Sequence, residues 1–288
     1  MANLKEIRNR ITSIKSTMQI TSAMKMVSAA KLKKAQDAIT AMRPYSSKLT
    51  ELLQNLSATL ESDASGEYSK QRDVSKVLLV VITSNRGLCG GFNSSITKEV
   101  VKTINEKYSN TSVDLFTIGK KGNDVLSKGY NVTANRSDIY DDLTFSNVAS
   151  LAENLMELFV DGTYDKIEIV YNQFKNAATQ ITQVEQFLPI KPIEGGDASA
   201  VNSDYIFEPS KEEIIEALIP KSLKTQLYKA LRDSFASEHG ARMTAMHKAT
   251  DNAKDLRDEL LLTYNKARQA AITNEILEIV GGAEALNN

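Results

Sequence analysis

The chain has 288 residues, of which 42% are hydrophobic and 25% are charged, and its formal net charge is -1 at pH 7. These values are close to the averages for soluble globular proteins, so they exclude wholesale disorder, and the length corresponds to about two domains. A single cysteine excludes an intramolecular disulfide framework, and the near-neutral charge argues against nucleic-acid binding over the whole surface.

The first segment, residues 1–48, carries ten Lys and Arg but only two acidic residues. Its apolar side chains recur at alternating spacings of three and four, the heptad pattern of a helix that pairs with another helix. We expect this seam to run along Leu4, Ile7, Ile11, Ile14 and Met18 and then to shift to Ile20, Met24 and Val27. Because no proline precedes Pro44, one helix is predicted from about residue 3 to 43, roughly 60 Å long.

The middle segment, residues 49–220, is acidic, with 15 basic and 25 acidic residues. A continuous apolar run at 76–83 predicts a strand buried on both faces. Further strands are expected at 113–118, 166–171 and 179–184, and helices at 96–107, 123–129 and 145–160. This order predicts an α/β domain with a largely parallel sheet and a later antiparallel pair.

A glycine-rich turn follows the first predicted strand, from Arg86 to Asn93, and Ser94 and Ser95 can cap the next helix. A strand, glycines and a helix N-terminus in this order can form an anion site. The turn lacks the G-x-G-x-x-G and G-x-x-x-x-G-K-[ST] spacings of nucleotide-binding proteins. A tight turn that needs glycine is favoured, and a Rossmann-type enzyme using Gly87 to Gly91 stays as an alternative.

The last segment, residues 221–288, contains no proline and predicts a second long helix to about residue 280, roughly 90 Å long. We expect its seam at Met246, Ala249, Ala253, Leu256, Leu260, Thr263, Ala267 and Ala270, with the apolar face extended upstream by Leu223, Leu227, Leu231 and Phe235. Gly240 is a weak point in this helix, and Gly281-Gly282 marks its expected end. Two narrow seams predict that the two long helices pair with each other.

No catalytic constellation emerges from these residues, and no cofactor or metal is expected. His239 and His247 are too far apart along a helix to share a metal ion, and both are expected on a solvated face. Cys89 has no nearby histidine and is expected to be a buried thiol. No apolar run reaches the ~18 residues that span a bilayer, and the start lacks the features of a secretory signal. A generic coiled-coil scaffold with an α/β head fits these observations.

Three motifs resemble the gamma subunit of F-type ATP synthase. The first is Ile11-x-Ser13-Ile14-x-x-Thr17-x-x-Ile20-Thr21-x-Ala23-Met24-x-Met26-Val27-x-Ala29-x-Lys31. The second is the turn Arg86-Gly87-Leu88-Cys89-Gly90-Gly91-x-Asn93. The third comprises Ser237-Glu238-x-x-Ala241-Arg242-Met243-x-Ala245-Met246-x-x-Ala249-Thr250-Asp251-Asn252-Ala253 and Tyr264-Asn265-Lys266-Ala267-Arg268-Gln269-Ala270-Ala271-Ile272-Thr273-x-Glu275-x-x-Glu278-Ile279-Val280-x-Gly282-Ala283. The resemblance covers the whole chain in order.

This resemblance implies a rotor shaft: a long antiparallel coiled coil of the two terminal helices (residues 1–60 and 210–288) with a central Rossmann-like α/β domain (70–208). The implied partners are three alpha and three beta subunits, the epsilon subunit and the c-ring, and catalysis belongs to the beta subunits. The chain would be peripheral to the membrane and would not span it. Without a transit peptide, a bacterial source and the cytoplasmic face of the inner membrane are expected.

The resemblance also assigns contact residues. Met24, Arg242, Arg268, Gln269, Thr273 and Glu275 match positions that meet the beta subunits, and Tyr205 and Glu208 match the foot near the c-ring and epsilon. For Met24 and Thr273, packing within the coiled coil remains an equal alternative. Gly240 stands where the family usually has a better helix former, which would make the shaft locally compliant. The cysteine insertion of chloroplast relatives is absent, so no thiol switch is expected.

Overall fold

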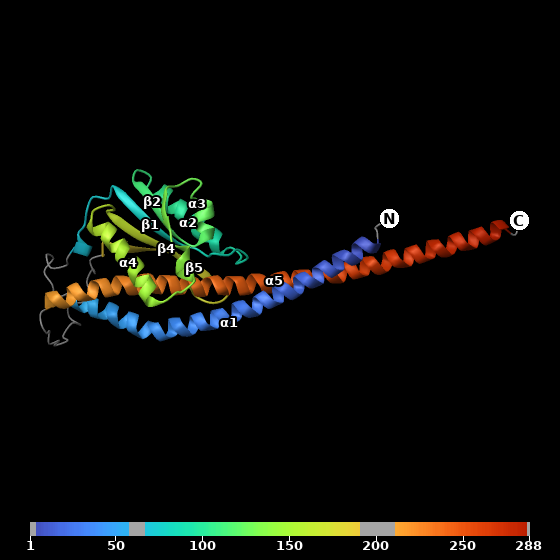
Figure 1. The fold of residues 1–288 in the computed structure, drawn as a ribbon, viewed down its shortest axis with the longest axis horizontal. Helices are drawn as coiled ribbons and strands as arrows, with labels where there is room; N and C mark the ends of the chain where they lie inside the picture. The colour runs from blue at the N-terminus through green and yellow to red at the C-terminus, as the bar shows by residue number, and fades with distance from the viewer. Residues whose placement is uncertain (1–3, 58–66, 191–210, 287–288) are drawn as a thin grey trace. The chain divides into compact units, whose positions relative to one another are not determined.

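The computed structural model describes residues 4–57, 67–190 and 211–286 and is drawn in Figure 1. The chain forms two compact units, one of Ala29–Arg242 and the other of Met1–Ser28 with Met243–Asn288. The two long terminal helices contribute residues to both units, and each unit is described by itself.

The order of elements confirms the predicted α/β domain between two long helices. The elements are α1 (Leu4–Ser57), β1 (Lys76–Ile82), α2 (Phe92–Lys107), β2 (Ser112–Ile118), α3 (Lys120–Leu126), β3 (Val132–Asn135), α4 (Phe145–Val160), β4 (Lys166–Phe174), β5 (Gln180–Leu188) and α5 (Lys211–Leu286), with short 3-10 helices at Glu67–Ser69 and Ser137–Tyr140. The strand β3 was not predicted, and it has only four residues and no fully buried side chain. A strand that is so short and partly exposed shows almost no alternation of apolar and polar residues, so its sequence does not reveal it.

The sheet has the order β3-β2-β1-β4-β5. Neighbouring strands from β3 to β4 are parallel, and β5 pairs with β4 in the antiparallel sense, as predicted. The carboxyl ends of β1 and β4 therefore meet at the same edge of the sheet. The turns that follow these two strands form the site described below.

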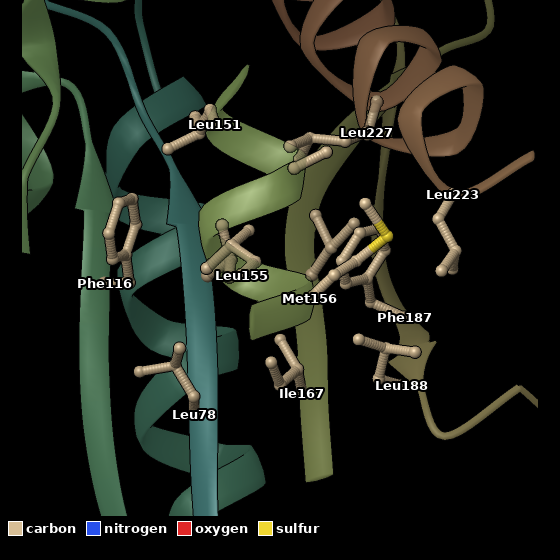
Figure 2. Packing of buried hydrophobic residues seen from close by; sticks show 14 of the residues in the cluster. Leu78, Phe116, Leu151, Leu155, Met156, Ile167, Phe187, Leu188, Leu223 and Leu227 are labelled. Atoms are coloured by element: carbon tan, nitrogen blue, oxygen red, sulfur yellow. The ribbon is translucent and has the colours of Figure 1, made fainter. Parts of the chain in front are cut away.

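Both faces of the sheet are buried, which explains why β1 is apolar and buried from Val77 to Ile82. One face packs against α4, and its cluster includes Leu78, Val80, Leu155 and Ile167. Figure 2 shows this face, where Leu151, Leu155 and Met156 of α4 lie over the strands that carry Leu78, Phe116 and Ile167. The opposite face packs against α2 and α3, and its cluster includes Val77, Leu79, Val81, Phe92, Ile96 and Leu126.

The first part of α5 belongs to the core of the α/β unit. Leu223, Leu227 and Leu231 are at most 3% exposed and lie in the same cluster as α4 and the sheet, as Figure 2 shows for the first two. Polar contacts add to this packing, because Gln226 Nε2 donates to the carbonyl of Gln186 on β5 at 3.0 Å. The upstream apolar face predicted for the coiled coil is therefore occupied by the α/β domain.

Both terminal helices are longer than the sequence predicts. The helix α1 continues through Pro44 to Ser57, and α5 begins before Pro220. A proline removes one backbone donor, but buried side chains such as Ile219 and Leu223 hold the turns on either side of Pro220. The expected stop at Gly281-Gly282 is also wrong, because neither glycine takes the positive φ of a helix-ending turn.

Smaller differences concern the helices of the α/β unit. The helix α2 begins at Phe92 with Gly91 as its N-cap, so Ser94 and Ser95 lie inside the first turn instead of capping it. Their hydroxyls donate back to the carbonyls of Gly91 and Phe92, which satisfies those hydroxyls within the helix. The helix α3 starts at Lys120, three residues earlier than expected.

In the second unit, the first part of α1 lies antiparallel to the last part of α5 (Figure 1). Ile7 and Ile11 are buried as predicted, but Ile20 and Val27 are 60% and 57% exposed. The predicted shift of the seam to Ile20 and Val27 is therefore wrong. The seam keeps its heptad spacing and continues through the polar residues Thr21 and Ser28, which are both buried. Thr250 Oγ1 on α5 donates to Thr21 Oγ1 at 2.7 Å, and Thr21 donates to the carbonyl of Met18.

The seam of α5 was half predicted. Five of the eight predicted residues are buried or half-buried, as expected: Met246, Ala249, Ala253, Leu260 and Ala267. The other three, Leu256, Thr263 and Ala270, are exposed. Their places are taken by Arg257, Tyr264 and Ala271, each one residue further along. Over the described residues, no helix has the length and apolar character needed to cross a membrane.

Candidate functional site

The glycine-rich turn after β1 is held in place by its own polar side chains. Leu88 has a φ of 62° and is 66% exposed, an unusual backbone conformation for a residue other than glycine. Cys89 beside it is 2% exposed, which confirms the expected buried thiol. Asn93 accepts from the backbone N–H of Ser84 at 3.0 Å and donates to the hydroxyl of Ser84 at 2.8 Å. These bonds close the turn onto the end of β1.

The side chain of Arg242 on α5 hydrogen-bonds to the backbone of this turn. Its NH2 nitrogen donates to the carbonyl oxygens of Arg86 at 3.0 Å and Gly87 at 3.3 Å. Its NH1 nitrogen donates to Glu238 Oε1 at 2.6 Å, one helical turn earlier on α5. The Arg242 side chain is 9% exposed, so these contacts take place out of water, where charged hydrogen bonds are strong.

Two titratable groups share the environment of Arg242. Burial raises the pKa of Glu238 above its usual value, although the charge of Arg242 opposes this. Burial and the cations Arg242 and Lys31 lower the pKa of His239 to about 3, so its ring is neutral at pH 7. Arg242 NH1 lies 3.4 Å from His239 Nδ1, and because a guanidinium only donates, this nitrogen is the acceptor.

His239 is thus the opposite of what the sequence analysis expected. It is 5% exposed, and its ring meets Phe235 edge-on with 4.4 Å between the ring centres. The expectation of a solvated face is wrong because this turn of α5 lies against the α/β domain. For His247 the expectation is confirmed, since its side chain is 57% exposed and lies 3.2 Å from Asp251.

Gly240 lies between Glu238 and Arg242 and faces a second turn of the α/β unit. A Cβ atom added at Gly240 would lie 3.2 Å from both the Cα and the carbonyl oxygen of Ala177, in the turn between β4 and β5. That is closer than side chains normally approach backbone, so the absence of a side chain lets this turn reach α5. The turn is braced by Asn176, whose Oδ1 accepts from the backbone N–H groups of Ala178 and Thr179.

Residues Glu238 to Arg242 therefore contact the turns after β1 and β4 together, and we call them the collar. The sequence predicts special roles for Arg242 and Gly240, but it does not predict that Glu238 and His239 belong to this arrangement. Two signals were available in the chain: a glycine in the middle of a long helix, and a carboxylate four residues before an arginine.

The arrangement offers little to a nucleotide phosphate. The turn at Arg86 and Gly87 presents carbonyl oxygens to a guanidinium, whereas a phosphate site presents N–H groups. At the adjacent strand end, the N–H of Gly122 already donates to Thr83 Oγ1 at 2.9 Å. A Cβ at Gly119 would lie 2.2 Å from the carbonyl oxygen of Thr83, so this glycine serves close packing.

The other described residues assigned by resemblance belong to the second unit. Met24 is half-buried on α1, whereas four residues on α5 are exposed: Arg268, Gln269, Thr273 and Glu275. Thr273 Oγ1 donates to the carbonyl of Gln269 at 2.9 Å, which is local to the helix. Tyr205 and Glu208 lie outside the described residues.

Comparison with known proteins gives a consistent result. The ATP synthase family model matches residues 3–286. An ATP synthase gamma chain from Flavobacterium johnsoniae is 74% identical over 287 residues, covering 100% of both chains. The gamma chain from Cytophaga hutchinsonii is 54% identical, again over 100% of both chains, and that from Geobacter sp. is 47% identical over 99% of both.

Solved structures agree with these relatives. A chain of the Tetrahymena thermophila mitochondrial ATP synthase central stalk and c-ring is similar with a TM-score of 0.59 and 27% identity, covering 80% of this chain and 99% of that one. A chain of the Euglena gracilis mitochondrial ATP synthase has a TM-score of 0.69 and 22% identity, covering 98% and 94%. The second likeness supports the fold.

Proposed function

The chain belongs to the ATP synthase gamma chain family, and we propose that it is the central rotor shaft of that complex. The shaft couples proton flow through the c-ring to ATP synthesis or hydrolysis on the beta subunits. Its partners are three alpha and three beta subunits, the epsilon subunit and the c-ring. The shaft acts by rotation, and each of its angles must favour different beta-subunit conformations for coupling to occur.

One observation carries this proposal: the last part of α5 exposes a series of large apolar side chains. The large apolar side chains that are exposed after residue 260 are Leu261, Leu262, Ile272, Ile276, Leu277, Ile279 and Val280. From Ile272 onward every residue with an assigned exposure is exposed. A helix with so much uncovered apolar surface is stable and soluble only when a partner covers it. A surrounding ring of alpha and beta subunits supplies such a sleeve.

The charge of α1 agrees with a sleeve lined by carboxylates. The first four basic residues of this helix are exposed: Lys5, Arg8, Arg10 and Lys15. Exposed ion pairs contribute only about 0–1 kcal/mol each, so carboxylates of the beta subunits would guide this helix without holding it at one angle. The same weakness permits rotation.

The same proposal assigns contacts to the individual residues that match contact positions of the family. Met24, Arg268, Gln269, Thr273 and Glu275 contact the beta subunits. Four of them are exposed, so they are available for such contacts. Arg242 is proposed to meet the same region, although its guanidinium nitrogens already have partners within the chain. Tyr205 and Glu208 are assigned to the foot near the c-ring and epsilon.

The shaft is formed from residues 1–60 and 210–288, and the Rossmann-like domain from residues 70–208. The chain itself is not catalytic, because the nucleotide sites belong to its partners. It is peripheral, at the cytoplasmic face of a bacterial inner membrane.

Two alternatives make different predictions. A generic coiled-coil scaffold would purify alone as a stable monomer or dimer and would have no affinity for a ring of alpha and beta subunits. A nucleotide-binding enzyme would bind ATP or NAD through the turn at Gly87 to Gly91, where Arg242 instead faces the carbonyl oxygens. Calorimetry with the full chain and either nucleotide distinguishes this case, and we expect no binding heat.

Co-expression with the alpha and beta subunits of the same organism tests the main proposal. We expect the chain to purify with both partners, and ATPase activity to assemble only when it is present. A matched control ends the chain at Thr263, which removes most of the exposed apolar side chains but leaves the α/β unit intact. Equal assembly of the shortened chain would contradict the role of the α5 surface, and no assembly of the full chain would contradict the proposal itself.

A further inference from the structure

The collar lies at the end of the part of α5 that belongs to the unit Ala29–Arg242. Earlier ties along α5 include the ion pair between Lys224 and Glu153 and the bond from Arg232 NH2 to the carbonyl of Leu143 at 2.8 Å. Resting on the proposed rotor function, we propose that the collar is a torque lock, which holds α5 to the α/β domain so that both turn together. Arg242 is its positioning residue.

The lock has two independent halves at one level of the helix. On one side, Arg242 binds the carbonyl oxygens of the turn after β1. On the other, Gly240 admits the backbone of Ala177, in the turn after β4. Because β1 and β4 are neighbouring parallel strands, both turns rise from the same edge of a rigid sheet. Two contacts on different sides of a helix resist its rotation about its own axis better than one.

The chemistry of Arg242 suits this role. One guanidinium nitrogen is bonded to Glu238 on its own helix and the other to the turn, so the planar side chain bridges the two elements. Glu238 fixes the side chain in the direction of the turn, because a buried carboxylate needs its cation. A single ammonium group cannot occupy both positions of the two guanidinium nitrogens.

Arg242→Lys is the sharpest test, because it keeps a cation beside Glu238 and removes the bridge. In the full chain, we expect backbone amides of residues 84–93 to exchange hydrogen at least about tenfold faster, since a hydrogen bond from a charged group contributes on this scale to a local opening equilibrium. Amides of β4 should exchange as in the parent chain. Lys248→Gln, which removes an exposed cation further along α5, is the matched control and should change neither segment.

The mechanical readout uses the complex with alpha and beta subunits, held by its ring. A probe on an exposed cysteine introduced as Lys128→Cys reports the angle of the α/β domain during pauses between steps. We expect a wider angular distribution for Arg242→Lys than for the parent. Arg242→Gln should widen the distribution further.

The outcomes separate the lock from other roles of Arg242. Unchanged exchange together with an unchanged angular distribution would overturn the lock. Altered hydrolysis or coupling with an unchanged distribution would also overturn it, and would assign Arg242 to a beta-subunit contact. Failure of the rotor proposal shows differently, because the parent chain itself would then fail to assemble with alpha and beta subunits.

Discussion

At the scale of single residues, Gly240 shows how one position can be interpreted in opposite ways. By helix propensity it is a defect, about 1 kcal/mol worse than alanine, and the sequence analysis expected it to loosen the shaft. In the structure it is buried, and the Ala177 backbone occupies the space where a side chain would be. The glycine therefore lets the β4–β5 turn approach α5 closely, and it favours a firm attachment.

Gly240→Ala tests this interpretation. The added methyl group lies 3.2 Å from the Ala177 backbone, in a turn braced by Asn176, so we expect strain to exceed the gain in helix propensity. The free energy of unfolding should fall by about 1 kcal/mol, and further for Gly240→Leu. Gly281→Ala is the matched control, because no atom lies within 4 Å of its added methyl group and helix content should rise. Urea unfolding of the full chain measures both, and a stabilising Gly240→Ala would refute close contact at this position.

His239 makes a prediction about pH. Its pKa is about 3 in the folded chain, and an unfolded histidine has an ordinary pKa near 6.5. Between these values the unfolded state binds more protons, so stability is lost as the pH falls through this range. From pH 6.5 to 5, His239 should contribute a slope of at most about 1.4 kcal/mol per pH unit, which His239→Gln removes.

The control for this pH prediction is His247→Gln, which replaces an exposed histidine on the same helix and should keep the slope of the parent. Carboxylates whose pKa values are lowered, such as Asp114 and Asp165, stay ionised in this range and are common to all three proteins. Equal slopes for His239→Gln and the parent in urea titrations at each pH would show that the His239 ring is not held neutral.

At the scale of elements, two parts of the continuous helix α5 pack against different partners. Its first part supplies Leu223, Leu227 and Leu231 to the core of the α/β domain. Its later part pairs with α1 through a narrow seam that includes the hydroxyl contact between Thr21 and Thr250. A periodic apolar pattern predicts that a helix face is covered, but it does not say by which element.

The seam of α1 supplies a test at this scale. Ile11→Ser removes a side chain that is 7% exposed, so we expect a loss of about 2–4 kcal/mol in the free energy of unfolding. Ile20→Ser makes the same chemical change on the same helix at a side chain that is 60% exposed, and it should cost less than about 1 kcal/mol. Thermal unfolding of the full chain, followed by helical circular dichroism, compares them. Similar losses for both variants would place Ile20 in the seam.

Much of the fold was predictable because strong local signals agree with it. Runs such as 76–83 and 145–160 have one dominant periodicity, and β1 and α4 lie there. The seam at Thr21 and Ser28 was missed because small polar residues can be buried when their hydroxyls bond to their own helix, as Ser28 does to Met24. The collar was missed because its parts are far apart in sequence, and only the folded chain brings Arg86 to Arg242.

At the scale of the whole molecule, the net charge of -1 conceals a strong division along the chain. The basic residues of α1 are separated in sequence from the acidic α/β domain, so a partner that meets only the long helices meets a cationic surface. For a shaft inside a ring, weak and distributed attraction permits turning, whereas one strong contact would stop it. Because rotation needs weak contacts, a single added charge on the shaft tests whether one strong contact impairs coupling.

Met24→Lys adds such a charge at a half-buried position of α1. We expect the complex to hydrolyse ATP at close to the parent rate but to pump protons poorly, because the new ammonium group binds a beta-subunit loop too tightly and disturbs the order of conformations that rotation imposes. Membrane vesicles containing the whole synthase give both rates, from phosphate release and from quenching of a pH-sensitive dye. Met24→Leu keeps an apolar side chain of similar volume and should pump normally, and Gln19→Lys adds the same charge at an exposed position elsewhere on α1. Normal coupling in Met24→Lys would remove Met24 from the beta-subunit contacts, whereas equal loss in Gln19→Lys would show that added charge anywhere on α1 is sufficient.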